Sequence, residues 1–190
     1  HITDGRWIEE LAGTNLYVPS YQGGIQAAID GASAGDVIHV DAGTYVEQVE
    51  VTKNVTIDGA GKGSTVIQSP ATLAKYWTTS TTNKPVVYVH DTAGMVLSDL
   101  TVDGLGLGNA NYRFIGVGFR NAGGTVTSCE VLNIMDTPFS GAQHGVGIYA
   151  WNDDSVSRSI TVDQCDVNGF QKTGIALNAG DTTPLVVSVT

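Results

Sequence analysis

The chain has 190 residues, of which 42% are hydrophobic and 15% are charged, a balance typical of a single globular domain. Its formal net charge of -10 argues against nucleic acid or an anionic membrane as the main partner. No apolar run approaches the roughly eighteen residues that a membrane span needs. Because the sequence starts at His1 rather than Met, we expect an exported protein, extracellular or at the cell surface.

The first part of the chain is expected to begin the fold. Residues 1–23 form an N-terminal segment, in which a strand at 16–18 ends at Pro19. Residues 24–33 then place four apolar side chains on one helical face. These are Ile25, Ala28, Ile29 and Ala32. We expect this helix to cap a repetitive structure, because terminal repeats need a cover.

Residues 36–190 are expected to form the repeats, with a loop insertion at 70–85. Two short patterns recur in the second half of this region. The first has apolar residues at its first, fourth and sixth positions, and its copies lie at 97–102, 126–131 and 162–167. The second starts at a glycine, and its copies lie at 116–119, 147–150 and 174–177. Apolar residues two apart and β-branched side chains indicate strands, and the Gly and Asn residues after them favour turns.

These repeats predict a single all-β domain over residues 1–190, a parallel β-helix (β-solenoid). One coil cannot bury its apolar face alone, so successive coils stack with parallel strands about 4.8 Å apart. The copies predict two core stacks, which are Leu100 with Cys129 and Cys165, and Val117 with Ile148 and Ile175.

The two cysteines, Cys129 and Cys165, occupy the same position in successive copies. Their Cα atoms should therefore be about one strand spacing apart, which a disulfide can span. The alternative is a pair of stacked, reduced core thiols, which we favour because a disulfide between directly stacked parallel neighbours is strained. No metal site is expected here, because the chain has no CxxC pair and no nearby His cluster.

Four short motifs follow one another between residues 24 and 67. They are Ile-Gln-Ala-Ala-Ile at 25–29, Gly-Asp-x-Ile-x-Val at 35–40, Ala-Gly-Thr-Tyr-x-Glu at 42–47, and Asp-Gly-Ala-Gly at 58–61. This order resembles the start of the pectin-lyase-like β-helix superfamily, and it is similar in particular to the opening of pectin methylesterases. The resemblance implies a right-handed parallel β-helix with an N-terminal capping α-helix.

The esterase resemblance also implies one catalytic candidate. The family carries an aspartate in a Gln-Asp-Thr-Leu segment, and the similar text here is Met135-Asp136-Thr137-Pro138. Asp136 is thus the candidate catalytic acid. The family's second aspartate, one coil later, has no counterpart in residues 168–174, so the required carboxylate pair is incomplete. The chain therefore differs from the esterases in its catalytic residues.

Loops that follow the first pattern should emerge side by side at one edge of the solenoid. They are expected at 103–114, 133–145 and 168–173. Their side chains include Tyr112, Arg113, Asp136, His144, Gln171 and Lys172. An aromatic ring, a carboxylate and several cations predict a groove for an acidic or neutral polysaccharide. The alternative is a set of ordinary solvated loop residues.

The opposite edge should gather the loops that follow the second pattern. It carries Trp151, Asp153, Asp154, Arg158 and Asp181. Carboxylates beside a tryptophan are compatible with Ca²⁺ or with a sugar, since hard cations prefer oxygen ligands. The alternative is that these aspartates accept hydrogen bonds from turn amides. No other cofactor is expected.

Two functions are compatible with these patterns. One is an exported β-helix that binds or processes an extracellular polysaccharide through one loop edge, as a lyase, hydrolase or esterase if it is an enzyme. The other is a structural or adhesive protein, a homopolymer in which residues 1–18, not needed for the solenoid, pair with the uncapped strand at 185–190 of another copy. Asn54, in Asn54-Val55-Thr56, matches the glycan acceptor rule.

Overall fold

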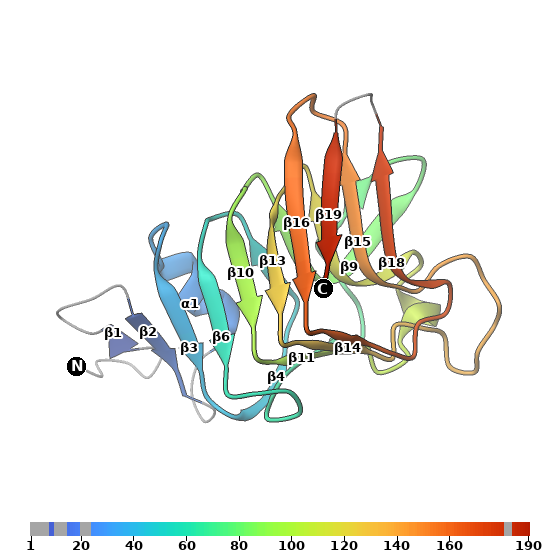
Figure 1. Ribbon diagram of the computed structural model, residues 1–190. Helices are drawn as coiled ribbons and strands as arrows, with labels where there is room; N and C mark the ends of the chain where they lie inside the picture. Colours follow the sequence, from blue (N-terminus) through green and yellow to red (C-terminus); the bar gives the residue numbers. More distant parts are fainter. Residues whose placement is uncertain (1–7, 10–14, 20–23, 181–183) are drawn as a thin grey trace.

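The strands of the computed structural model wind through three sheets, each of which receives one strand per coil (Figure 1). The structure describes residues 8–9, 15–19, 24–180 and 184–190. Within these ranges, every strand pair in the three sheets is parallel except β1 with β2. The predicted parallel β-helix is therefore confirmed.

The elements have the following bounds. Sheet A runs in the order β1 (Ile8–Glu9), β2 (Asn15–Val18), β3 (Val37–Val40), β6 (Thr56–Gly59), β10 (Met95–Ser98), β13 (Gly124–Thr127), β16 (Arg158–Asp163) and β19 (Leu185–Val189). Sheet B runs in the order β17 (Asp166–Val167), β14 (Glu130–Leu132), β11 (Thr101–Asp103), β7 (Thr65–Gln68) and β4 (Gly43–Val46). Sheet C runs in the order β18 (Thr173–Ala179), β15 (Val146–Asn152), β12 (Phe114–Arg120), β9 (Thr82–His90) and β5 (Val49–Val51), with β8 (Trp77–Thr78) antiparallel to β9. Helix α1 spans Ile25–Gly31, and a short 3-10 helix spans Gly108–Ala110.

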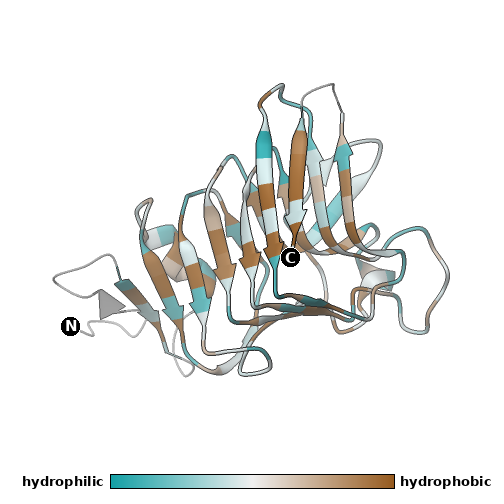
Figure 2. Ribbon diagram, viewed as in Figure 1, coloured by the Kyte–Doolittle hydropathy of each residue, from teal (hydrophilic) through white to brown (hydrophobic). Residues whose placement is uncertain are grey.

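The register predicted from the repeats is confirmed in all three copies. Val117 pairs with Ile148, and Ile148 pairs with Ile175, in sheet C. In sheet A, Leu97 pairs with Val126, and Val126 pairs with Val162. Figure 2 shows hydrophobic colour recurring at the same level of successive strands in sheet A, as expected for side chains that stack inside the coils. The core is thus a column of aligned apolar ladders.

A left-handed residue turns the chain from sheet A into sheet B in each of three successive coils. These residues are Asp99, Ser128 and Gln164, with φ between 50° and 53°. Each comes directly before a residue of the stack that Leu100 begins. The Ser128 N–H donates to the Asp163 carbonyl at 3.0 Å, so one corner is bonded to the next. A repeated corner of this kind keeps the ladders in register.

Helix α1 packs as the sequence predicts, and the first coil caps both of its ends. Its apolar face, which includes Ile25 and Ile29, is buried. At the N-terminus, the Glu47 carboxylate accepts the Ile25 N–H at 2.7 Å. At the C-terminus, Lys53 Nζ donates to the Ile29 and Ala32 carbonyls at 2.8 and 2.6 Å. Both charges also have the sign that favours their end of the helix dipole.

Two segments differ from the sequence-based expectation. The prediction that residues 1–18 are dispensable is wrong for β2, which pairs with β3 and buries Leu16 and Val18. Residues 1–7 and 10–14 lie outside the described part of the chain. The predicted loop at 70–85 contains β8 and the start of β9, because Trp77 is buried against the outer face of sheet C.

Candidate functional site

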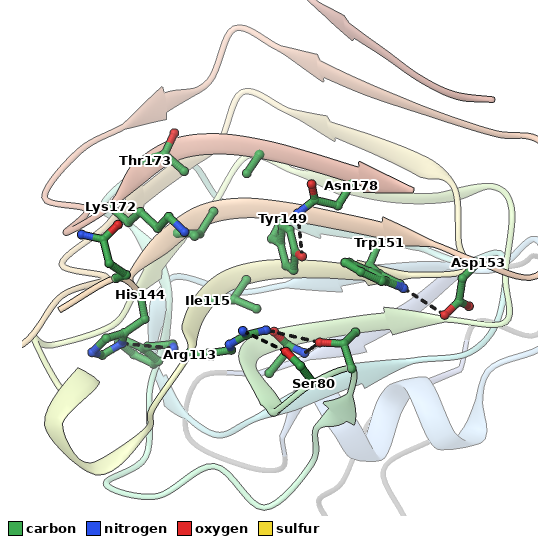
Figure 3. Close-up of a pocket in the computed structure, with 16 residues that line it drawn as sticks. Ser80, Arg113, Ile115, His144, Tyr149, Trp151, Asp153, Lys172, Thr173 and Asn178 are labelled. Atoms are coloured by element: carbon green, nitrogen blue, oxygen red, sulfur yellow. Dashed lines mark hydrogen bonds between the residues drawn. The ribbon is translucent and has the colours of Figure 1, made fainter. Parts of the chain in front are cut away.

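A pocket of about 480 Å³ lies on the outer face of sheet C (Figure 3). Its walls are the β8–β9 hairpin, the last part of the loop at 133–145, and the beginning and end of β18. The lining residues are Thr79, Ser80, Asn83, Arg113, Phe114, Ile115, Gln143, His144, Val146, Tyr149, Trp151, Asp153, Lys172, Thr173, Ala176 and Asn178. Figure 3 shows His144 and Lys172 at one end, and Trp151 with Asp153 at the other.

The floor of the pocket consists of the outward-facing side chains of sheet C. Tyr149 and Ala176 are register neighbours on β15 and β18, and Ile115 and Val146 lie beside them. Tyr149 is 8% exposed, and its hydroxyl accepts a hydrogen bond from Asn178 Nδ2 at 3.0 Å. The floor is therefore apolar, with polar groups at its margin, as in many small-molecule sites.

The hairpin wall is held in place by Trp77. Its ring lies between the rings of Tyr88 and Tyr149, with centroid distances of 5.4 and 5.9 Å and nearly parallel planes. The space for the indole exists because Gly118 has no side chain, and a Cβ there would lie 2.9 Å from Trp77 ring atoms. One glycine thus allows an insertion to become a pocket wall.

Arg113 joins this wall to the body of the protein. Its guanidinium donates to Thr79 Oγ1 at 3.2 Å, to Ser80 Oγ at 3.3 Å and to Asn83 Oδ1 at 3.4 Å. All three acceptors are neutral, so the charge of Arg113 is not compensated by them. In the described part of the chain, neither Arg113 nor Lys172 belongs to an ion pair.

Trp151 and Asp153 form the other end of the pocket. The half-buried Trp151 donates its indole N–H to Asp153 Oδ2 at 3.0 Å. Arg120 contacts both oxygens of the Asp153 carboxylate. The hydrogen bonds from Arg120, together with those from Trp151 and Asn121, lower the pKa of Asp153 to about 2 although burial opposes this. Asp153 is the one carboxylate among the described lining residues, and its negative charge is already balanced by Arg120.

Asp136, the candidate catalytic acid, lies behind His144 and does not line the pocket. It is 3% exposed, and its Oδ2 accepts hydrogen bonds from Ser140 and from Gln171 Nε2. Its Oδ1 has no well-aligned hydrogen-bond partner among the described residues, although His144 Nε2 lies 3.2 Å away. Burial raises the pKa of Asp136. The hydrogen bonds from Ser140 and Gln171 and the neighbouring His144 lower this pKa by a larger amount, so the net shift is downward. A buried carboxylate held in its charged form is poorly suited to donate a proton to a ligand.

The structure brings most of the predicted binding residues together. Arg113, His144, Lys172 and Trp151 all line this pocket, although Trp151 was expected at the opposite edge. The two edges meet because β15 runs from one to the other. Tyr112 does not line the pocket, but its ring packs on His144 with centroids 5.1 Å apart, and it is 55% exposed.

Sequence reasoning missed the floor and the hairpin wall. Tyr149 is the third residue of the repeated Gly147–Ala150 pattern, and the alternation of strand side chains predicts that it faces away from Ile148. That signal was available. The contribution of Thr79, Ser80 and Asn83 was not, because a polar segment gives no indication that it folds back over a sheet.

The remaining residues of the opposite edge form separate ion pairs. Asp153 pairs with Arg120, and Asp154 pairs with Arg158 Nη2 at 2.6 Å. Asp181 lies outside the described residues. Across the described ranges, no group of three or more His, Cys, Asp and Glu side chains is arranged to hold a metal ion. Asp153 and Asp154, two of the carboxylates suggested for Ca²⁺, are therefore each engaged by an arginine.

Cys129 and Cys165 are free thiols in neighbouring coils. They precede the register partners Glu130 and Asp166, as the repeat alignment predicts. The hydrogen bond between the thiols raises the pKa of the buried Cys129, with burial acting in the same direction, and it lowers the pKa of Cys165 to about 7. Of the two alternatives, the structure has the reduced pair.

Asn54, the predicted glycan acceptor, is exposed at a turn. Its Oδ1 accepts hydrogen bonds from Thr92 Oγ1 and from the backbone N–H groups of Ala93 and Gly94 at 3.2 and 2.8 Å. These bonds all use the Oδ1 atom of Asn54. None of them involves the Nδ2 atom, where a glycan would be attached. Modification at Asn54 stays a prediction.

Comparison of the sequence with the known protein families and with curated protein sequences gives no match. Within the described ranges, no helix combines the length and the apolar character that a membrane crossing requires.

Proposed function

We propose that this protein is exported and binds an extracellular polysaccharide in the pocket on sheet C. The observation that carries the proposal is the combination of an aromatic floor with uncompensated cations. Trp151 offers a ring for the apolar face of a sugar, next to the largely buried Tyr149 of the floor. Arg113 lies on the hairpin side of the pocket beside Ser80, and Lys172 lies at the end opposite Trp151. The likeness of residues 24–67 to the pectin-lyase-like superfamily supports the same class of ligand.

The charges favour an acidic polysaccharide over a neutral one. Arg113 and Lys172 have no carboxylate partner among the described residues, whereas Asp153 is paired with Arg120. The pocket is thus locally positive in a protein whose formal net charge is -10. A carboxylate or sulfate group on the sugar would supply the missing counter-charge, and an arginine fork suits such planar or multidentate anions.

The shape favours a short stretch of sugar lying along the strands. Val146 and Trp151 are five positions apart on β15, which corresponds to about 17 Å at the usual strand rise. The β8–β9 hairpin closes the side of the pocket toward the N-terminal coils. A chain that runs parallel to the solenoid axis would meet that hairpin, whereas one along β15 would not.

Binding is better supported than cleavage. Hydrolysis by paired carboxylates needs one free acid and one free base near the ligand. Asp153 is held by Arg120, and Asp136 lies behind His144, so the described lining residues provide no such pair. The protein is therefore proposed to act as a binding module.

The test is calorimetric titration with polygalacturonate, alginate and a neutral glucan. We expect binding to the acidic polymers that weakens as salt is added. Trp151→Ala should weaken it about fivefold to tenfold, since an aromatic stack contributes on the order of 1 kcal/mol. Phe139→Ala is the matched control, because Phe139 is 64% exposed and does not line the pocket. Equal losses in both variants, or binding to none of the polymers, would contradict the proposal.

A second candidate function is assembly into a fibre through the C-terminal coil. In the core ladders, Ala150 and Val162 are 3% and 2% exposed, but their register neighbours Leu177 and Val189 are 43% and 61% exposed. Inward-facing residues of this coil thus lack a covering layer in the described structure. A strand from a second copy would provide one.

Sedimentation over a range of protein concentrations distinguishes this candidate. Assembly predicts species larger than a monomer that disappear in Leu177→Glu but persist in Val46→Glu, because Val46 is an exposed outward residue on β4. A monomer at every concentration would rule the fibre out.

A further inference from the structure

We infer that Asp153 is a positioning residue that fixes Trp151 as a rigid platform for the ligand, and that Arg120 in turn fixes Asp153. The inference rests on the proposed function of the pocket, because a platform has a role only if something stacks on it. It extends that function by assigning a task to the one carboxylate among the described lining residues.

Every acceptor direction of the Asp153 carboxylate is occupied. Oδ1 accepts hydrogen bonds from Arg120 Nη1 and from Asn121 Nδ2, the latter at 3.1 Å. Oδ2 accepts from Arg120 Nη2 at 2.9 Å and from Trp151 Nε1 at 3.0 Å. The backbone N–H of Asp153 also donates to Asn121 Oδ1 at 2.8 Å. The carboxylate is therefore held from two strands at once, since Arg120 and Trp151 are register partners on β12 and β15.

This arrangement decides how Trp151 can contact a ligand. Its indole N–H is already bonded to Asp153, so the ring face is what it presents to the pocket. A ring held in one orientation before binding loses less freedom when a sugar stacks on it, which increases affinity without a new contact. Because the pKa of Asp153 is about 2, the carboxylate stays charged and the bond is kept near neutral pH.

The neighbouring Asp154 provides a matched control. It also pairs with an arginine, Arg158, but it does not line the pocket or contact Trp151. Asp153→Asn and Asp154→Asn therefore each remove one carboxylate and one ion pair from the same loop. Thermal unfolding of both variants checks that they remain folded.

Two readouts test the inference. The first is the indole N–H resonance of Trp151 in ¹⁵N-labelled protein, assigned by its absence in Trp151→Phe. We expect Asp153→Asn to move this resonance and Asp154→Asn to leave it in place. An unmoved resonance in Asp153→Asn would overturn the inference, whatever the ligand turns out to be.

The second readout is the affinity for polygalacturonate, measured as a double-mutant cycle. Asp153→Asn should weaken binding about fivefold in the wild-type background, but have no further effect in the Trp151→Phe background, because it acts through the indole N–H. Equal losses in both backgrounds would refute the positioning role. If the resonance moves as expected but no polysaccharide binds the wild type, the proposed function fails and the platform role fails with it, while the Asp153 to Trp151 bond stands.

Discussion

Gly118 lies on β12 between its register neighbours Tyr88 and Tyr149, and it leaves the space that Trp77 fills. The pocket depends on this position, because the Trp77 indole packs the β8 arm of the hairpin that carries Thr79, Ser80 and Asn83 onto the outer face of sheet C. Gly118 has no functional side chain, but the position of the hairpin wall depends on it. Within the wall, Arg113 adds the hydrogen bonds that hold the hairpin tip.

Gly118→Ala should therefore loosen the hairpin. The added Cβ would lie 2.9 Å from Trp77 ring atoms and from Pro85 Cβ, and overpacking of this kind costs about 1–3 kcal/mol. We expect a lower melting temperature together with faster proteolysis between residues 70 and 85. Gly94→Ala is the control, since a Cβ there meets only Asn54 side-chain atoms at 3.5 Å or more. Equal behaviour of the two variants would show that Gly118 does not set the hairpin position.

At the scale of elements, β15 serves the core and the pocket at once. Ile148 and Ala150 face inward and are buried, whereas Tyr149 and Trp151 face outward to the pocket. The alternation of a single strand therefore places the pocket residues Tyr149 and Trp151 directly over buried core residues. A platform on such a strand is held more firmly than one on a loop.

Ile148→Asp tests the stacking of these strands. Ile148 is 2% exposed between Val117 and Ile175, so an unpaired carboxylate there should cost at least about 3 kcal/mol of unfolding free energy. Val46→Asp, at a position that is 61% exposed, should change stability by less than about 0.5 kcal/mol. Denaturant titration gives both values, and an unchanged midpoint in Ile148→Asp would refute the register.

The repetition of residues from coil to coil explains what the sequence could and could not predict. The register of residues that repeat, such as Val117, Ile148 and Ile175, can be predicted from the sequence, because equivalent residues of successive coils stack on each other. Arg113, His144 and Lys172 were predicted as neighbours for the same reason, since they flank equivalent strands. The contact of Trp77 with Gly118 was not predictable, because it joins an insertion that does not repeat to a position that is unusual only in lacking a side chain. Asp136 was placed by resemblance to a motif, and such a motif carries no information on burial.

At the scale of the whole molecule, the acidic protein carries a locally positive pocket. The net charge of -10 would repel the proposed acidic polymer from most of the surface, whereas Arg113 and Lys172 would attract it to one place. Such a distribution favours a defined binding position over general adhesion. It also predicts that salt weakens binding at the pocket while reducing repulsion elsewhere.

The most direct test is a crystal structure of the protein soaked with a short oligogalacturonate. We predict sugar density along β15, with a ring stacked on Trp151 and a carboxylate within hydrogen-bond distance of Arg113 or Lys172. Sugar bound at another face of the solenoid, or an empty sheet C pocket at a concentration that saturates binding in solution, would contradict it.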